Sequence, residues 1–174
     1  MRKLLIIICL LAALTGVAFA SPESDFLDRM GPVAQEIIPG YGLWPSVFLA
    51  QAALESGWGR SWLAVNANNY FGRKCLQLPC IEIKTPEYRK GQRMIEDHSF
   101  QIYESIPDAV HGYCQQFFRT YLYSGLPVYP ELDASTPEAF IRSVAWRYAT
   151  DPDYADKVLG IIGRYDLTRY DRRE

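Results

Sequence analysis

Motifs that mark several common protein classes are missing from this chain of 174 residues. It has neither a G-x-S-x-G motif nor a P-loop, so nothing indicates an α/β-hydrolase serine nucleophile or a nucleotide-binding protein. Beyond residue 20, no apolar run approaches the roughly 20 residues that a membrane-spanning helix needs. Internal repeats, low-complexity segments and linkers are also absent, which argues against a separate binding module.

An excess of basic residues is missing as well. The formal net charge is −2, and the arginines near the C-terminus alternate with acidic residues. Proteins that bind nucleic acid usually carry a basic face. We therefore expect no nucleic-acid partner.

The first 20 residues have the features of a secretory signal peptide. Arg2 and Lys3 precede an apolar run from Leu4 to Leu14, and Ala18 and Ala20 form an A-x-A cleavage site. The run is too short to span a bilayer. We therefore expect residues 1–20 to be removed near Ala20 and residues 21–174 to form one domain. That domain is expected to be a monomer without a membrane span, exported to the periplasm or secreted.

Histidine and cysteine are scarce, with two and four residues. Cys75 and Cys80 are the expected disulfide, because the four residues between them can form a tight loop and export places them where disulfides persist. Cys114 lies on an apolar stripe and is expected to be a buried, inert thiol. A zinc site would combine the pair with His98 and His111, but twelve residues separate the histidines, against roughly three to five in a zinc finger. We expect no metal.

One predicted helix carries the most informative carboxylate of the chain. Pro45 suits a first helical position and Gly57 suits a helix exit, so Glu55 falls in the last turn, one turn after Gln51 on the same face. Apolar neighbours on that face would desolvate Glu55, and the negative end of the helix dipole would add to the effect. Both disfavour ionisation, so we expect Glu55 to hold a proton near neutral pH and to act as a general acid. A solvated surface glutamate is the alternative.

Aromatic, amide and glycine residues follow Glu55 closely. Aromatic rings stack on the C–H faces of pyranose rings, and amides bond hydroxyl and acetamido groups. These features are typical of a site that binds sugars, although large aromatics such as Trp62 and Phe71 could equally fill the core. The candidate substrate-binding residues are Gln51, Trp58, Asn69, Tyr70 and Phe71.

Four matches in order resemble the bacterial glucosaminidase family, glycoside hydrolase family 73. They are ALESGWG at 53–59 followed by NNYFG at 68–72, then TPEY at 85–88, the F-x-x-Y-x-S region at 100–109 and YATDPDYADKVLGII at 148–162. The cysteine pair after NNYFG is most similar to the Bax-type branch. The resemblance implies an α+β, mainly α, lysozyme-like domain with a small β-hairpin lobe. It also implies hydrolysis of the β-1,4 bond after N-acetylglucosamine in peptidoglycan glycan strands, without a cofactor.

The resemblance also suggests the partners of Glu55. Glycoside hydrolysis usually takes two carboxyl groups, and Glu87 in TPEY matches the position where many family members carry a second glutamate. Weaker alternatives on the same lobe are Glu82, Glu96 and Asp97. Tyr148 matches a tyrosine of the family's cleft, where its hydroxyl could orient the acetamido group or a water molecule. As part of an apolar stripe, it could instead belong to the core.

The periodicity predicts helices around one hairpin. We expect a helix over Asp25–Ile38, broken or kinked at Gly31 and Pro32, and a hairpin of Ile81–Tyr88 with Gln92–Tyr103. Further helices are expected to start at three capping signals. These are Ser105 to Asp108, Thr136-Pro137 and Asp151-Pro152.

Two other functions stay open. A lytic transglycosylase would also place a glutamate before a serine at a helix end, but it would continue with a G-x-x-G-L-M-Q-like segment where NNYFG stands here. A catalytically inactive wall-binding protein would keep the aromatic cleft but would not need the acid. The presence of Glu55 in a fully matching motif argues against that second alternative.

Overall fold

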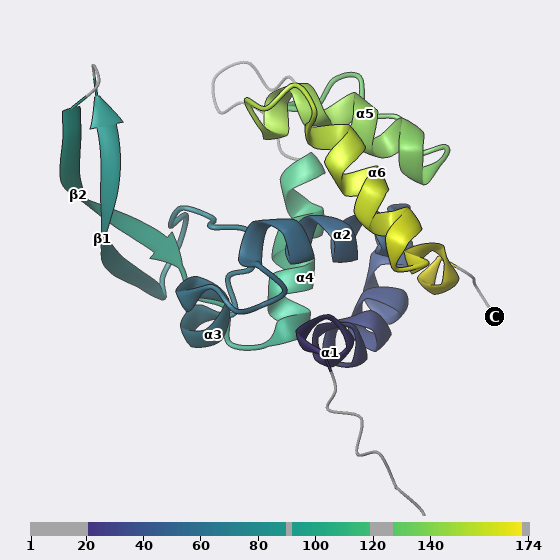
Figure 1. Ribbon diagram of the computed structural model, residues 1–174, viewed down its shortest axis with the longest axis horizontal. Coiled ribbons are helices and arrows are strands. Elements are labelled where there is room, and N and C mark those ends of the chain that lie inside the picture. The colour runs from purple at the N-terminus through teal and green to yellow at the C-terminus, as the bar shows by residue number, and fades with distance from the viewer. Residues whose placement is uncertain (1–20, 90–91, 119–126, 172–174) are drawn as a thin grey trace, which may run out of the picture.

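The structure, a computed structural model, describes residues 21–89, 92–118 and 127–171 (Figure 1). Its α-helices pack together, and a single antiparallel hairpin stands beside them, so the expectation of a mainly α fold with a small β lobe is confirmed. The signal peptide expected at 1–20 lies outside the described residues. Within the described ranges, no helix is both long and apolar enough to cross a membrane. The elements are α1 (Pro22–Ile37), α2 (Pro45–Ser56), α3 (Trp62–Ala67), β1 (Cys80–Arg89), β2 (Gln92–Gln101), α4 (Ile106–Gln115), α5 (Pro137–Tyr148) and α6 (Tyr154–Arg164), with 3-10 turns η1 (Ile38–Tyr41), η2 (Gln116–Phe118) and η3 (Leu167–Tyr170).

Helix α2 is the centre of the core. Nearly all of its residues are buried, and α1, α5, α6 and η3 pack around it. A helix that is apolar on all sides is stable only when other elements surround it. The helix starts with Pro45 and ends at Gly57, which adopts a left-handed conformation (φ 58°), as expected. Glu55 is therefore carried at the end of the most enclosed helix of the domain.

Helix α1 corrects one expectation. Pro32 lies inside it and the helix is not broken there, since α1 runs without interruption from its Ser21 cap to Ile37. Gly31 has a packing role instead. A Cβ atom at this position would lie 2.4 Å from a ring carbon of Tyr170, so only glycine lets α1 and η3 approach this closely. The Gly-Pro pair thus marks a close contact between elements rather than a helix end.

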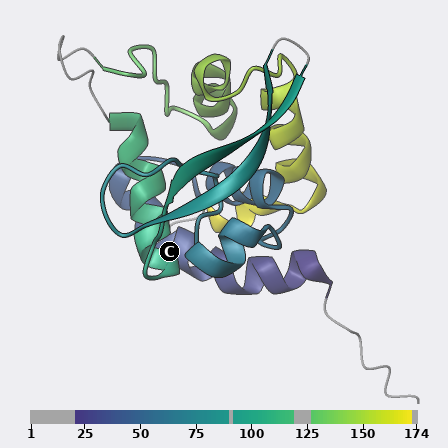
Figure 2. The same cartoon turned by 90° about the vertical axis from the view of Figure 1, so that its left-hand side faces the viewer.

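The hairpin is long and stands to one side of the helices (Figure 1), so that in Figure 2 it crosses in front of them. Its register pairs Cys80 with Gln101 at the base and Arg89 with Gln92 near the tip. Within the described residues it forms a two-stranded sheet, and an isolated antiparallel bridge joins Lys74 to Phe100 at its base. The base is attached to the helical part because Gln101 N–H donates to the Arg73 carbonyl (3.0 Å). The predicted hairpin is confirmed, although its turn at residues 90–91 lies outside the described residues.

Two of the three predicted capping signals start helices. Ser105 Oγ accepts the Asp108 N–H (3.2 Å) ahead of α4, and Thr136 Oγ1 accepts the Ala139 N–H (3.0 Å) ahead of α5. The Asp151-Pro152 start is wrong, since α6 begins at Tyr154 after its cap residue Asp153. The Asp151 carboxylate instead accepts the Asp153 N–H (3.0 Å) and so closes the turn that precedes the helix.

The cysteines pair as expected. Cys75 and Cys80 form a disulfide, with their Cα atoms 5.7 Å apart, so neither is available to a metal. Cys114 is a free, fully buried thiol on α4.

We expect Cys114 to react with iodoacetamide only after unfolding. Burial raises the pKa of its thiol from the ordinary value of 9.0 to about 12, so the reactive thiolate is scarce in the folded protein near neutral pH. For the same reason, this thiol contributes stability below pH 9 that is lost as the pH rises towards about 12. Mass spectrometry of native and denatured protein measures the labelling. Rapid labelling in the native state, or a disulfide joining Cys114 to either other cysteine, would contradict the assignment.

Candidate active site

Glu55 opens onto a cavity of about 510 Å³. The residue is exposed, so the burial that we expected to desolvate its carboxylate is absent. The reason is local, because the chain turns away at Gly57 directly after the last turn of α2 and leaves the carboxylate at the cavity wall. The other lining residues are Phe71, Arg73, Gln116, Tyr129, Arg147, Tyr148, Ala149, Thr150 and Asp151. Helices α2 and α5, the segment after α3 and the turn before α6 thus meet at this cavity.

A chain of hydrogen bonds connects the core to Glu55. Tyr113 Oη donates to Gln51 Oε1 (2.6 Å), and Gln51 Nε2 donates to Tyr154 Oη (3.1 Å). Tyr154 Oη then donates to Glu55 Oε1 (2.8 Å). Among the described residues, no hydrogen bond engages Glu55 Oε2. The chain therefore fixes one carboxylate oxygen and leaves the other for a ligand.

The two tyrosines beside Glu55 stay protonated. The rings of Tyr148 and Tyr154 stack with their centroids 5.4 Å apart. Burial is the main cause that raises the pKa of both hydroxyls, and the negative charge of Glu55 adds to it. Arg73 acts in the opposite direction on Tyr148. Both groups are hydrogen-bond donors throughout the neutral pH range.

Only some of the candidate binding residues reach the cavity. Phe71 and Tyr148 line it, whereas Gln51 is fully buried behind it and acts through Tyr154. Trp58 packs against the rings of Phe26 and Tyr165, and Tyr70 also packs against Phe26. In this structure Trp58 and Tyr70 contribute to packing.

Asn69 also lies outside the cavity wall. Its Nδ2 donates to the carbonyls of Arg73 (2.9 Å) and Gln101 (2.9 Å), while its Oδ1 accepts the Arg73 N–H (2.9 Å). The side chain is buried and fully used by the backbone. Asn69 therefore positions Arg73 and the base of the hairpin.

Glu87 lies on β1, where its backbone pairs with Met94, while its side chain lies outside what the structure describes. None of the described hairpin residues lines the Glu55 cavity. A role for Glu87 therefore remains a prediction.

Several residues at the site have no counterpart among the sequence candidates. Tyr154 and Tyr113 belong to apolar stripes. A tyrosine hydroxyl buried in such a stripe needs a hydrogen-bond partner, and this need is the sequence signal that could have identified them. Arg73 follows directly after NNYFG, and Asp151 lies in the expected helix start. Gln116 lines the cavity with its Nε2 buried, and its side chain acts on the neighbouring Tyr148 hydroxyl, whose pKa it lowers slightly against the effect of burial.

The fold and the cavity define a class, that of helical, lysozyme-like glycoside hydrolase domains with one carboxylate at the end of a buried helix. The comparisons with known proteins name the family. Residues 31–167 match the glucosaminidase family model, described as mannosyl-glycoprotein endo-beta-N-acetylglucosaminidase, and the chain belongs to this family.

Relatives with names and structures support the assignment. The chain is 37% identical over 151 residues to the exo-glucosaminidase LytG of Bacillus subtilis (strain 168), which covers 86% of this chain and 54% of LytG. The catalytic domain of the autolysin Auto from Listeria monocytogenes superposes with a TM-score of 0.76 at 30% identity, covering 88% of this chain and 92% of that domain. The glycoside hydrolase domain of Salmonella typhimurium FlgJ gives a TM-score of 0.66 at 28% identity, covering 86% and 91%. The chain spans about half of LytG and smaller shares of several other curated relatives.

Proposed function

We propose that this protein is a peptidoglycan hydrolase that cleaves the β-1,4 bond after N-acetylglucosamine, with Glu55 as the general acid. The observation that carries the proposal is the Glu55 carboxylate in its cavity, with Oε1 held by Tyr154 and Oε2 unengaged among the described residues. Family membership supports the substrate class. Export to the periplasm or beyond the cell, and action as a monomer, are part of the proposal.

The geometry supports a division of roles. Glu55 protonates the glycosidic oxygen as the bond breaks. Tyr148, a protonated donor on the same wall, orients the substrate's acetamido group or a water molecule. Phe71 offers an aromatic surface to a sugar ring. The group that attacks or stabilises the anomeric carbon is either Glu87 or the acetamido oxygen of the substrate.

The products of digestion are the test of this function. Purified peptidoglycan should yield new reducing ends on N-acetylglucosamine, because water completes the reaction. A lytic transglycosylase would instead leave anhydro-muramic ends, and an N-acetylmuramidase would leave reducing N-acetylmuramic acid. Mass spectrometry after borohydride reduction distinguishes the three. Either of the last two as the main product would overturn the proposed specificity.

A further inference from the structure

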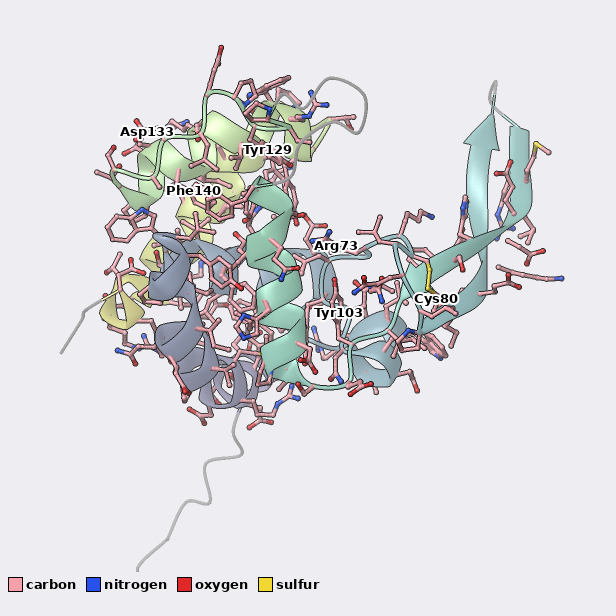
Figure 3. The ribbon with its side chains drawn as sticks, turned by 180° about the vertical axis from the view of Figure 1, so that it is seen from behind. Arg73, Cys80, Tyr103, Tyr129, Asp133 and Phe140 are labelled. Carbon is pink, nitrogen blue, oxygen red and sulfur yellow. A yellow bond between two sulfur atoms is a disulfide. The ribbon has the colours of Figure 1, made fainter. Side chains whose placement is uncertain are left out.

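A second cavity, of about 700 Å³, lies on the other side of Arg73 from Glu55. We name it the side cavity. Figure 3 shows Arg73 between α4 and the base of the hairpin, with Tyr103 and Cys80 nearby. The residues of the side cavity that carry the argument are Arg73, Gln77, Tyr103, Asp108, His111 and Gln115. Arg73 lines both cavities, so a ligand that extends from one to the other passes this guanidinium.

Arg73 is held in place for such a role. Asn69 fixes its backbone on both sides, and its Nη1 donates to the Gly112 carbonyl of α4. The positive charge of Arg73 acts in both cavities. Burial raises the pKa of the Tyr103 hydroxyl on one side and of the Tyr148 hydroxyl on the other, and the charge of Arg73 acts to lower both. A guanidinium has further donors beyond the one that bonds Gly112. It can therefore still bind a carboxylate.

The opposite wall of the side cavity is also fixed. The disulfide closes the loop that contains Gln77, and the buried Gln101 holds this loop from within. Gln101 Oε1 accepts the N–H groups of Leu76 (3.2 Å) and Gln77 (3.4 Å), while its Nε2 donates to the carbonyls of Gln77 (2.8 Å) and Pro79 (3.2 Å). A wall held this way needs little reordering when a ligand binds.

The polar groups on α4 follow an order along the side cavity. Gln115 lies next to Gln116 of the Glu55 cavity, Gly112 lies one turn earlier, and Asp108 lies at the far end. From Asp108 to Gln115 the helix rises about 10 Å, which is the length of about three extended residues. The cavity thus offers a cation near the Glu55 cavity and two carboxylates, Glu104 and Asp108, around the start of α4, where Asp108 Oδ2 also accepts the Ser105 hydroxyl (2.6 Å).

We propose that the side cavity binds the stem peptide of the substrate, with Arg73 holding one of its carboxylates. The inference rests on the proposed function, because in peptidoglycan the muramic acid next to N-acetylglucosamine carries a short peptide with free carboxylates. A glycan strand in the Glu55 cavity places that peptide beside the scissile bond. Arg73 binds a carboxylate at the entrance, and Asp108 lies where an amino group further along the peptide would pair.

Cleavage rates on two substrates test the proposal. One is intact peptidoglycan, and the other is the same material after an amidase has removed the stem peptides. Arg73→Gln should lower kcat/KM on intact strands by about tenfold or more, because a charge-assisted hydrogen bond is lost. On peptide-free strands the loss should be clearly smaller, because only the effect of Arg73 on the Glu55 cavity and Tyr148 remains there. Lys74→Gln removes the neighbouring cation, which lies over the Phe100 ring and lines neither cavity, and should leave both rates unchanged. Equal losses on the two substrates, or no loss on intact strands, would overturn the proposal.

Binding separates this proposal from the proposed function. Glu55→Gln protein labelled with ¹⁵N should show shifts at the side-chain amides of Gln77 and Gln115 when titrated with the tripeptide L-Ala-γ-D-Glu-meso-diaminopimelate. The shifts should weaken when Arg73→Gln is added. A titration that moves neither amide sinks the peptide site even if the enzyme is active. A parent protein that cleaves neither substrate overturns the proposed function, and the titration still decides the side cavity.

Discussion

Replacing Glu55 with glutamine should lower the rate of peptidoglycan cleavage by a factor of about 10² to 10⁴, the usual contribution of a positioned general acid. Glutamine keeps the size of the side chain, and its amide oxygen can still accept the Tyr154 hydroxyl that now bonds Oε1. What it lacks is a proton to transfer. The measurement is the release of reducing ends from purified peptidoglycan, with the melting temperature as a check on folding. A folded Glu55→Gln protein with parental activity would remove Glu55 from the mechanism.

Two further glutamates serve as references for that experiment. Glu82 is exposed on β1 and does not line the Glu55 cavity, so Glu82→Gln should leave the rate near the parental value. Glu87→Gln then separates two mechanisms. A large loss would show that the hairpin carboxylate takes part in the reaction. Near-parental activity beside an inactive Glu55→Gln would favour attack by the acetamido group of the substrate.

Replacing Gln51 with leucine should lower the free energy of unfolding by about 2 to 4 kcal/mol. Gln51 is 0% exposed and bonds two tyrosine hydroxyls, so its loss leaves Tyr113 without its acceptor and Tyr154 without a donor in the interior. Each buried polar group without a partner costs about 1 to 3 kcal/mol. In a domain of this size, the melting temperature should fall by about 5 to 15 °C.

Calorimetry or thermal unfolding followed by circular dichroism measures this fall. Gln115→Leu is the matched control because it makes the same exchange at an exposed position of α4, where the change should stay within about 0.5 kcal/mol. The double variant Gln51→Leu with Tyr113→Phe should recover part of the lost stability, since it removes the hydroxyl that has lost its acceptor. A Gln51→Leu protein that melts like the parent would show that the buried hydrogen-bond chain contributes little.

Local signals predicted much of the fold. Pro45 and Gly57 set the ends of α2, and Ser105 and Thr136 start α4 and α5, because caps depend on residues within one turn. Of the break or kink expected at Gly31 and Pro32, the break does not occur, since α1 is continuous there. Gly31 instead allows a close contact with Tyr170, which is distant in sequence and so cannot be recognised from the local pattern.

The site was predictable where a motif carried it. Glu55, Phe71 and Tyr148 come from three separate segments and line one cavity. The hydrogen-bond chain from Tyr113 through Gln51 and Tyr154 joins α4, α2 and α6. Such a chain exists only once the helices are packed, so apolar periodicity alone placed both tyrosines in the core without their partners.

The way the hairpin is attached has a mechanical consequence. Its base is held in place, because Asn69 bonds both Arg73 and Gln101, and the disulfide closes the loop beside it. Beyond that base, two strands extend, and no third strand pairs with them in the part of the chain that the structure describes (Figure 2). A two-stranded ribbon twists easily. With its base held in this way, the hairpin is not expected to rotate as a rigid body about the base. If the outer hairpin reaches a bound glycan, it does so by bending along its length while its base stays in place.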